Sequence, residues 1–468
     1  MPIRSCVVVN ADTGGPTPVD IRIACGPGGD SLITAVAPRL ATGSADVVVD
    51  ADRCAVMPGF VDHHAHLFAT AAADSSTPCG PPAVRDRADL AAALARAPSD
   101  PAGWVRGTGY IETVAGDLDA DVLDGLHADR PVRIQHRSGA LWTVNAAAIR
   151  ALRLDTADHP GVERDPLGRP TGRLWRADDL VRSRLPGAGP PALDAVGARL
   201  AGLGIVEITD ATPDLDDRSL TALITAADER RLPQRLHLLG VPLGKQVASS
   251  RVTTGPYKIV VADAPMPSLT ELTAAVTAAH EAGRAVAVHC VSRAALALSL
   301  AAGVGRGDRV EHAGVVDAST ARHLGELGVT VVTQPGFLAD RGDDFLDGSD
   351  PGDHDDLYRC ASLTRVGVPV ALSSDTPYGP VDPLAVIDAA VHRRTRLGRR
   401  VGRPDERCTA AQAFAAYQSG AATPGGPERR IAVAECGDVV VLDRPGREVL
   451  ADPGAARVVH TLIEGRPV

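Results

Sequence analysis

The chain has 468 residues, 44% of them hydrophobic, which is enough for one large barrel with a smaller domain or for two or three average domains. Its net charge of -10 predicts no basic surface that would bind nucleic acid or an anionic bilayer. Its eight cysteines include no C-x-x-C pair. No window approaches the roughly 18 apolar residues of a membrane-spanning helix. We therefore expect a cytoplasmic protein with reduced thiols that acts on a small molecule, with no nucleic-acid or membrane partner and with a homodimer left open.

The first 54 residues are predicted to form short strands separated by Gly, Pro and Asp turns. Residues 428–468 again contain strand-like runs, at 438–443 and 458–464. Because chain termini commonly lie close together in space, we expect both ends to combine into one composite β-sandwich domain. The predicted N-terminal strands are 3–9, 19–24, 32–36 and 47–49.

Between the two ends, short β-branched runs alternate with Ala- and Leu-rich stretches, a pattern typical of parallel strands with crossover helices. The strands number eight, which favours an α/β fold with a closed (β/α)8 TIM-like barrel, built from residues 55–66 and 191–427. The predicted strands are 55–62, 204–210, 235–241, 257–263, 285–290, 309–313, 329–334 and 368–375. The predicted helices include 215–231, 269–282, 293–302, 318–327 and 384–396.

One connection of this barrel is much longer than a simple βα loop. Residues 67–190 separate the first strand from the second, and they contain strand and helix signals of their own at 131–136 and 144–152. We therefore expect an insertion after the first barrel strand, folded as a subdomain that could cover the barrel mouth.

The first barrel strand ends in Pro58-Gly59-Phe60-Val61-Asp62-His63-His64-Ala65-His66. Residues i and i+2 of a strand share a face, so His64 and His66 are predicted to point the same way and His63 the opposite way. Barrel enzymes keep their chemistry at the carboxyl ends of the strands, where two convergent imidazoles form half of a metal site. A turn with solvated histidines gives the same H-x-H spacing, so the motif alone leaves both interpretations open.

Three further strand ends carry residue types that bind metals. The fifth strand ends at His289, the sixth at His312 and the eighth at Asp375. A divalent cation makes hydroxide available at neutral pH, and Asp375 could take its proton and pass it to a departing nitrogen. We therefore expect one or two divalent ions at this end of the barrel, with zinc as the expected metal.

Lys258 opens the fourth strand and is one of two lysines in the chain, the other being Lys245. An ammonium group beside divalent cations would be repelled. An amine that adds carbon dioxide becomes instead an anionic carbamate, a bridging ligand that a guanidinium cannot imitate. A salt-bridged or snorkelling lysine is the alternative.

The chain resembles the amidohydrolase superfamily, and within it the family 3 branch of exoenzyme-regulatory-protein-like and N-substituted formamide deformylase-like amidohydrolases. The resemblance covers nearly the whole chain. It rests on Pro-Gly-Phe-Val-Asp-x-His-x-His at 58–66, Gly-Arg-Ala-Val-Ala-Val-His at 283–289, Asp-Arg-Val-Glu-His-Ala at 308–313, Val-Thr-Gln-Pro at 332–335, Ser-Ser-Asp-Thr-Pro at 373–377 and the final strand at 437–443.

This resemblance implies the role of each ligand. His64 and His66 would hold a first metal ion, His289 and His312 a second, carboxylated Lys258 would bridge the two, and Asp375 would serve as ligand and proton shuttle. Relatives often follow the strand-five histidine with Gly-Asp-Arg, whereas this chain has Cys290-Val291-Ser292-Arg293, so the substrate contacts and the metal count stay open. The candidate substrate contacts are Trp142, Gln334, Arg341 and Tyr378.

The sequence thus predicts a metal-dependent hydrolase that cuts a non-peptide carbon–nitrogen bond in a small amide-like substrate. A mononuclear deaminase of a heteroaromatic or amidine substrate is one alternative, and a carbamate on Lys258 would argue against it. A catalytically silent barrel relative is the other alternative, which is disfavoured because a scaffold has no use for six costly polar groups around one cavity.

Overall fold

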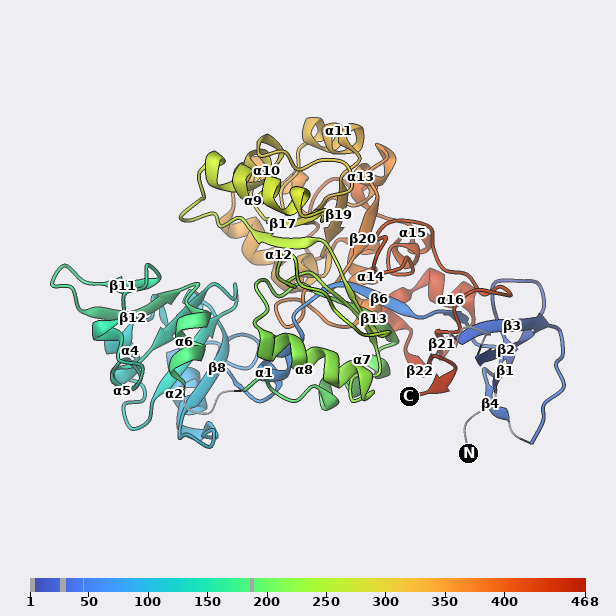
Figure 1. Ribbon diagram of the computed structural model, residues 1–468, viewed down its shortest axis with the longest axis horizontal. Coiled ribbons are helices and arrows are strands. Elements are labelled where there is room, and N and C mark those ends of the chain that lie inside the picture. The colour runs from blue at the N-terminus through green and yellow to red at the C-terminus, as the bar shows by residue number, and fades with distance from the viewer. Residues whose placement is uncertain (1–4, 26–30, 45, 186–188) are drawn as a thin grey trace. The chain divides into compact units, whose positions relative to one another are not determined.

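A computed structural model describes residues 5–25, 31–44, 46–185 and 189–468 (Figure 1). The chain forms two compact units, one built from Met1–Leu67 and Ala192–Val468 and the other from Phe68–Pro191. In sequence the second unit corresponds to the predicted insertion at 67–190. Among the described helices, none combines the length and apolar character needed to cross a membrane.

Both ends of the chain contribute four-stranded sheets to the first unit. One sheet has the order β3-β2-β1-β4 and the other the order β23-β22-β21-β5. Alternate residues of these strands, among them Val8, Ile23, Val441 and Leu462, are buried in one shared hydrophobic core. The strands are β1 (Ser5–Ala11), β2 (Val19–Cys25), β3 (Ser31–Ala37), β4 (Asp46–Asp50), β5 (Val56–Pro58), β21 (Val439–Leu442), β22 (Val458–Ile463) and β23 (Arg466–Pro467).

The remaining strands of the first unit are all parallel and form two sheets. One has the order β15-β14-β13-β6 and the other runs in chain order from β16 to β20. Backbone hydrogen bonds connect the sheets on both sides, from Lys258 N to Leu239 O at 3.1 Å and from Asp375 N to His64 O at 2.8 Å. These nine strands follow one another around an α/β barrel of the TIM type, one more than the eight predicted, because β15 at 252–254 was not predicted. They are β6 (Phe60–Ala65), β13 (Ile205–Asp210), β14 (Arg235–Leu238), β15 (Val252–Thr254), β16 (Tyr257–Val260), β17 (Val286–Cys290), β18 (Arg309–His312), β19 (Thr330–Thr333) and β20 (Val370–Leu372).

The first predicted barrel strand, at 55–62, is divided between two sheets. β5 pairs with β21 in the terminal sheet, whereas β6 pairs with β13 in the barrel. Gly59 separates them, and a Cβ atom at this position would clash with the side chain of Val206. The apolar run is continuous in sequence, so the hydrophobic pattern alone could not reveal the division.

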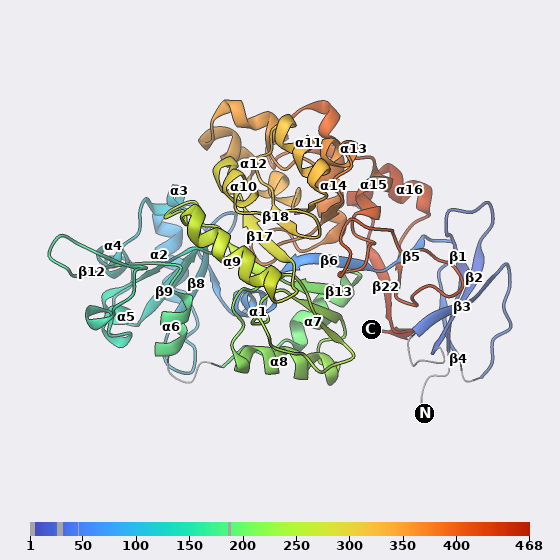
Figure 2. The same cartoon turned by 45° about the horizontal axis from the view of Figure 1, so that its top comes forward.

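Helices lie outside the parallel strands in both views (Figures 1 and 2). Several begin at a side chain that accepts a backbone N–H of the first turn, as Ser268, Ser292 and Asp317 do. The helices are α7 (Asp194–Gly202), α8 (Asp217–Asp228), α9 (Leu269–Glu281), α10 (Arg293–Ala301), α11 (Ala318–Leu327), α12 (Gly336–Gly348), α13 (Ala361–Arg365), α14 (Pro383–His392), α15 (Ala410–Ala415) and α16 (Gly446–Ala451).

The second unit contains a six-stranded sheet in the order β11-β12-β10-β9-β8-β7, with hydrophobic clusters of its own. The predicted strand at 131–136 corresponds to β9, and the predicted helix at 144–152 to the end of β10 followed by α5. Its elements are α1 (Leu67–Asp74), which starts at the boundary, β7 (Thr77–Pro78), α2 (Arg87–Arg96), β8 (Val105–Tyr110), α3 (Glu112–Ala115), α4 (Ala120–Asp124), β9 (Val132–His136), β10 (Leu141–Val144), α5 (Ala146–Ala151), β11 (Val162–Arg164), β12 (Pro170–Trp175) and α6 (Asp178–Arg184).

Candidate metal centre

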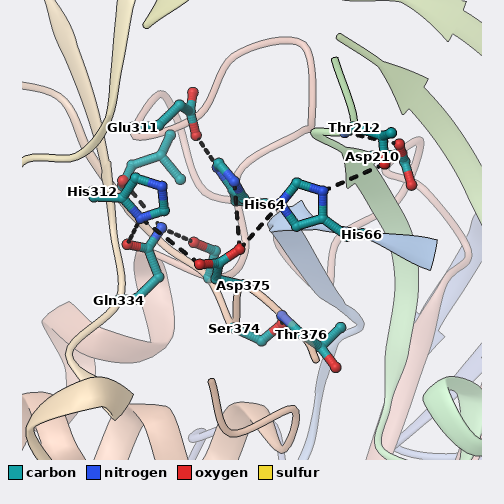
Figure 3. Close-up of polar contacts among 12 residues, drawn as sticks. His64, His66, Asp210, Thr212, Glu311, His312, Gln334, Ser374, Asp375 and Thr376 are labelled. Atoms are coloured by element: carbon teal, nitrogen blue, oxygen red, sulfur yellow. Dashed lines mark hydrogen bonds and ion pairs between the residues drawn. The ribbon is translucent and has the colours of Figure 1, made fainter. Parts of the chain in front are cut away.

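His64 and His66 lie near the carboxyl end of β6, a strand in which every residue is buried. Being two residues apart, they leave the strand on the same side. The amide of His66 donates to Thr376 O at 2.9 Å, which fixes the backbone just after the strand. The Nδ1 of His66 lies 3.4 Å from Thr212 Oγ1, so its ring is also held on the side away from Nε2 (Figure 3).

Asp375 faces these two histidines from the segment that follows β20. Its Oδ1 lies 3.6 Å from Nε2 of His64 and 3.3 Å from Nε2 of His66 (Figure 3). Its backbone has a φ of 56°, a left-handed conformation that non-glycine residues adopt mainly where the surrounding structure enforces it. One ligand atom from each of the three residues lies within 4.8 Å of the others. His64, His66 and Asp375 therefore form a group that could hold a metal ion.

The two chain segments that carry this group are tied together by Asp62 and Ser374. The hydroxyl of Ser374 donates to Asp62 Oδ2 at 2.5 Å, and its amide donates to Oδ1 at 3.1 Å. Burial raises the pKa of Asp62 to about 6, although these hydrogen bonds act against that shift. The first and eighth strands are thus joined next to the ligands they supply.

His289 and His312 form a second histidine pair beside the group. Their ring centroids are 4.4 Å apart, and the His312 ring is 4.9 Å from that of His64. The Nδ1 of His312 lies 2.8 Å from Gln334 Oε1 and 3.9 Å from Asp375 Oδ2. The structure therefore brings both predicted ligands of a second ion to the same end of the barrel, next to Asp375.

Lys258 also reaches this cluster. Its side chain comes from β16, its residue is 4% exposed, and its Nζ lies 3.4 Å from Nε2 of His64. Burial lowers the pKa of Lys258 to about 8, although the carboxylates of Glu311 and Asp375 act in the opposite direction. The six predicted ligands therefore lie in one connected cluster, in which Lys258 contacts His64.

Glu311 is a functional residue that the sequence analysis did not identify. Its carboxylate accepts a hydrogen bond from Nδ1 of His64 (Figure 3). It also pairs with Arg309. Burial would raise the pKa of Glu311, but the charges of Arg309 and His64 hold it well below its usual range. A carboxylate on Nδ1 fixes the tautomer that leaves the Nε2 lone pair for a metal. The sequence feature that points to Glu311 is the spacing Arg-x-Glu at 309–311, because residues two apart in a strand share a face.

The charge state of the cluster suits a cation. Burial lowers the pKa of His64 to about 3 and keeps the pKa values of His289 and His312 below their usual range. Burial would raise the pKa of Asp375, but hydrogen bonding to His66 and the neighbouring imidazoles lower it. The Oδ1 of Asp375 is buried and faces Nε2 of both His64 and His66. Neutral imidazoles and an available carboxylate oxygen form a donor set that fits Zn²⁺.

The four candidate substrate contacts occupy different positions. The side chain of Gln334 is buried against His312, and the Tyr378 ring lies 5.6 Å from that of His66. The guanidinium of Arg341 donates to Tyr378 O and lies 4.9 Å over the Phe337 ring. These three lie in the barrel unit, close to the ligands or to residues beside them.

Trp142 lies in the other unit. It is buried in the core of that unit, where its Nε1 donates to Asp178 at 2.8 Å. The structure therefore gives Trp142 a packing role within the inserted unit. Contact of any of the four residues with a substrate stays a prediction.

Known proteins resemble this chain along most of its length. A family model described as "Amidohydrolase family" matches residues 47–468. The N-substituted formamide deformylase of Arthrobacter pascens is 25% identical and is matched over 99% of this chain and 98% of its own. The putative amidohydrolase YtcJ of Bacillus subtilis (strain 168) is 27% identical over 73% of this chain and 74% of its own. An uncharacterized metal-dependent hydrolase from Pyrococcus horikoshii OT3 shares the fold, with a TM-score of 0.69, 18% identity and coverage of 99% of this chain and 100% of its own.

Proposed function

The chain belongs to the amidohydrolase family, and from this premise we propose that it hydrolyses a non-peptide carbon–nitrogen bond in a small amide-like substrate with the help of a divalent metal. The observation that carries the proposal is the convergence of His64, His66 and Asp375, whose ligand atoms lie within 4.8 Å of one another. The fold that we propose for this chemistry is a closed (β/α)8 barrel with a β-sandwich formed by both chain ends.

The donor set supports zinc as the metal, because it combines imidazole nitrogens with a carboxylate oxygen. His64, His66 and Asp375 would hold one ion, and His289 with His312 would hold a second. When bound, such a cation lowers the pKa of water and polarises the carbonyl group of a substrate.

Lys258, as a carbamate, would be a ligand shared by two such ions. Its buried Nζ lies beside Nε2 of His64, at the strand end where the other ligands converge. In this step the ammonium group first loses one proton, and the neutral amine then forms an N–C bond to carbon dioxide and loses a second proton, which leaves an anionic carbamate. A mass increase of one carbon dioxide on Lys258, or a carbamate in a crystal structure, would support this step, and an unmodified lysine in active enzyme would contradict it.

We propose that the proton transfers of the reaction pass through Asp375. Asp375 accepts a proton from the attacking water and delivers it to the nitrogen as the carbon–nitrogen bond breaks, so the products are an acid and an amine. Glu311 keeps the ring of His64 in place through its Nδ1. The contacts of its Oδ1 with Nε2 of His64 and of His66 support a double role for Asp375, as ligand and in proton transfer.

We further propose that the substrate is a small uncharged or mixed-charge molecule and that the enzyme acts in the cytoplasm without a nucleic-acid or membrane partner, alone or as a homodimer. The net charge of -10 supports the first part. The seven cysteines with described side chains are all free thiols, which supports a reducing environment. The relative from Arthrobacter pascens bears the name of an N-substituted formamide deformylase, so N-substituted formamides are the first substrates to test.

A panel of substrates tests the proposed reaction. Zinc-loaded protein would be incubated with N-substituted formamides, N-acyl amino acids, cyclic ureas and heteroaromatic amines, and the release of acid, amine and ammonia would be measured. We expect an amine and an acid to appear together, to disappear with a chelator and to return with zinc. Ammonia released from heteroaromatic amines alone would indicate a deaminase, and folded, zinc-loaded protein inactive on every compound would contradict the proposal.

A further inference from the structure

Gln334 lies directly after β19, at the end of the strands where the metal ligands gather. It is 0% exposed, as are its neighbours Thr333 and Ser373. Its side chain points towards His312, with which it shares a hydrogen bond (Figure 3). A side chain enclosed in this way is surrounded by protein atoms, so its role follows from its contacts with them.

The contacts of Gln334 fix which end of its amide faces His312. One amide atom lies 3.3 Å from Val332 O and 2.9 Å from Ser373 Oγ, and the other lies 2.8 Å from His312 Nδ1. A backbone carbonyl only accepts hydrogen bonds, so the atom that faces Val332 O must be the nitrogen Nε2. Oε1 is therefore the atom that faces His312, and Nε2 has a partner within the protein for each of its two N–H groups.

This orientation of the amide decides the tautomer of His312. Oε1 only accepts, so Nδ1 of His312 must carry a proton and donate it. Asp375 Oδ2 also faces this nitrogen, but it lies 3.9 Å away, beyond hydrogen-bond distance. Burial of His312, which is 3% exposed, favours the neutral ring with one N–H. Nε2 is therefore left with a lone pair, which is the state that a metal ligand needs.

A similar arrangement occurs at His64, whose Nδ1 donates to Glu311. The two acceptors differ in charge, because Glu311 is a carboxylate paired with Arg309, whereas Gln334 is a neutral amide held by a hydroxyl and a carbonyl. Gln334 therefore orients its histidine without adding negative charge to the cluster.

The orientation of His312 matters because the second ion has fewer ligands already in place. Among the described residues, His64, His66 and Asp375 form a group of three ligand atoms within 4.8 Å of one another, and no such group contains His289 or His312. A second ion would depend on the alignment of two imidazole rings. A change in the ring of His312 should therefore weaken its binding.

We propose that Gln334 is a positioning residue and not a substrate contact: its amide, fixed by Val332 O and Ser373, holds the ring of His312 with Nδ1 protonated and Nε2 free for the second ion. This inference rests on the proposed metal-dependent function, because it assigns His312 to an ion. The tautomer of His312 is a property of the protein that can be measured without any activity.

The zinc affinity of Gln334 variants tests the effect on the second ion, with a chromophoric chelator as competitor. Gln334→Met keeps the length of the side chain but removes the acceptor, so the affinity for the second ion should fall by about 10- to 100-fold while that for the first is unchanged. Gln334→Glu keeps an oxygen that accepts from Nδ1 of His312 whether its carboxyl is ionised or protonated, so it should restore the affinity. Gln246→Met is the control, since Gln246 is exposed in a loop. A fall of equal size in Gln334→Met and Gln334→Glu, or no fall in either, would overturn the proposal.

Neutron diffraction from deuterated crystals of the unaltered, zinc-loaded protein tests the tautomer directly and needs no variant that folds. We expect deuterium on Nδ1 of His312 and on Nε2 of Gln334, directed towards Val332 O and Ser373 Oγ. Deuterium on Nε2 of His312, or a reversed amide of Gln334, would overturn the proposal. The expected deuterium positions in crystals without a second zinc would contradict the second ion of the proposed function, but they would support Gln334 as the residue that holds His312.

Discussion

The two ends of the barrel strands differ in the polar side chains that they bury. The carboxyl end gathers His64, His66 and Asp375 as acceptor atoms for a cation. The amino end contains Arg309 and His237, two buried basic residues that belong to the lining of a cavity. The same strand, β18, serves both ends, because Arg309 opens it and His312 closes it. The position of a polar residue along β18 therefore decides which end of the barrel its side chain serves.

The variant Asp375→Asn should produce the largest effect and break the cation site at the carboxyl end. It removes the negative ligand and the group that transfers the proton, so kcat/KM should fall by about a thousandfold. Steady-state kinetics on the first substrate found by the panel would measure it. Asp355→Asn is the matched control, since Asp355 is exposed, and it should leave kcat/KM within about twofold of the unaltered enzyme. Similar activity in both variants would remove Asp375 from the mechanism.

The variant Glu311→Gln tests the carboxylate that contacts both Arg309 and His64. The amide keeps the shape of the side chain but loses the charge that bonds to His64 and Arg309, so metal affinity should fall by about 10- to 100-fold. Competition with a chromophoric chelator would measure this affinity. Glu326→Gln changes an exposed glutamate of α11 and should have no effect. Unaltered zinc affinity in Glu311→Gln would mean that Glu311 does not position His64.

The dependence of the free energy of unfolding on pH tests whether His237, at the amino end of the strands, is neutral in the folded protein. Burial lowers the pKa of His237 to about 3 from an ordinary value of 6.5, so between these pH values the unfolded chain binds a proton that the folded chain does not. The stability contributed by neutral His237 is present above pH 6.5 and is lost as the pH falls, by about 1.4 kcal/mol per pH unit.

In His237→Leu this component is absent, so its free energy of unfolding should fall less steeply than that of the unaltered protein between pH 6 and pH 4. Urea denaturation at several pH values would measure the difference, with His460→Leu as the control because His460 is exposed. Equal slopes in the unaltered protein and in His237→Leu would mean that His237 titrates in the folded state as it does in the unfolded chain.

The sequence predicted His64, His66, His289, His312 and Asp375 as candidate ligands because each lies at the end of an apolar strand. Alternation along β6 requires that His64 and His66 share a side, and parallel strands bring His289, His312 and Asp375 to the same end. Glu311 could not be found in this way, because it precedes His312 and adjacent strand residues normally face opposite sides. The φ of 71° at His312 ends that alternation, and no glycine in the sequence announces the turn.

Other features depended on contacts between segments far apart in the chain. The division of one apolar run at Gly59 follows from its packing against Val206. The cavity at the amino end includes residues 421–427, and nothing in their sequence indicates that they lie beside Arg309. Trp142 illustrates the same limit, since an aromatic residue in an insertion can serve a substrate or a core, and this one is buried in a core.

Anomalous diffraction at the zinc absorption edge, on crystals of zinc-loaded protein, tests the central claim most directly. We predict a peak coordinated by Nε2 of His64, Nε2 of His66 and Oδ1 of Asp375 at about 2.0–2.2 Å. A zinc peak away from these three side chains, in protein that is folded and active, would contradict the account.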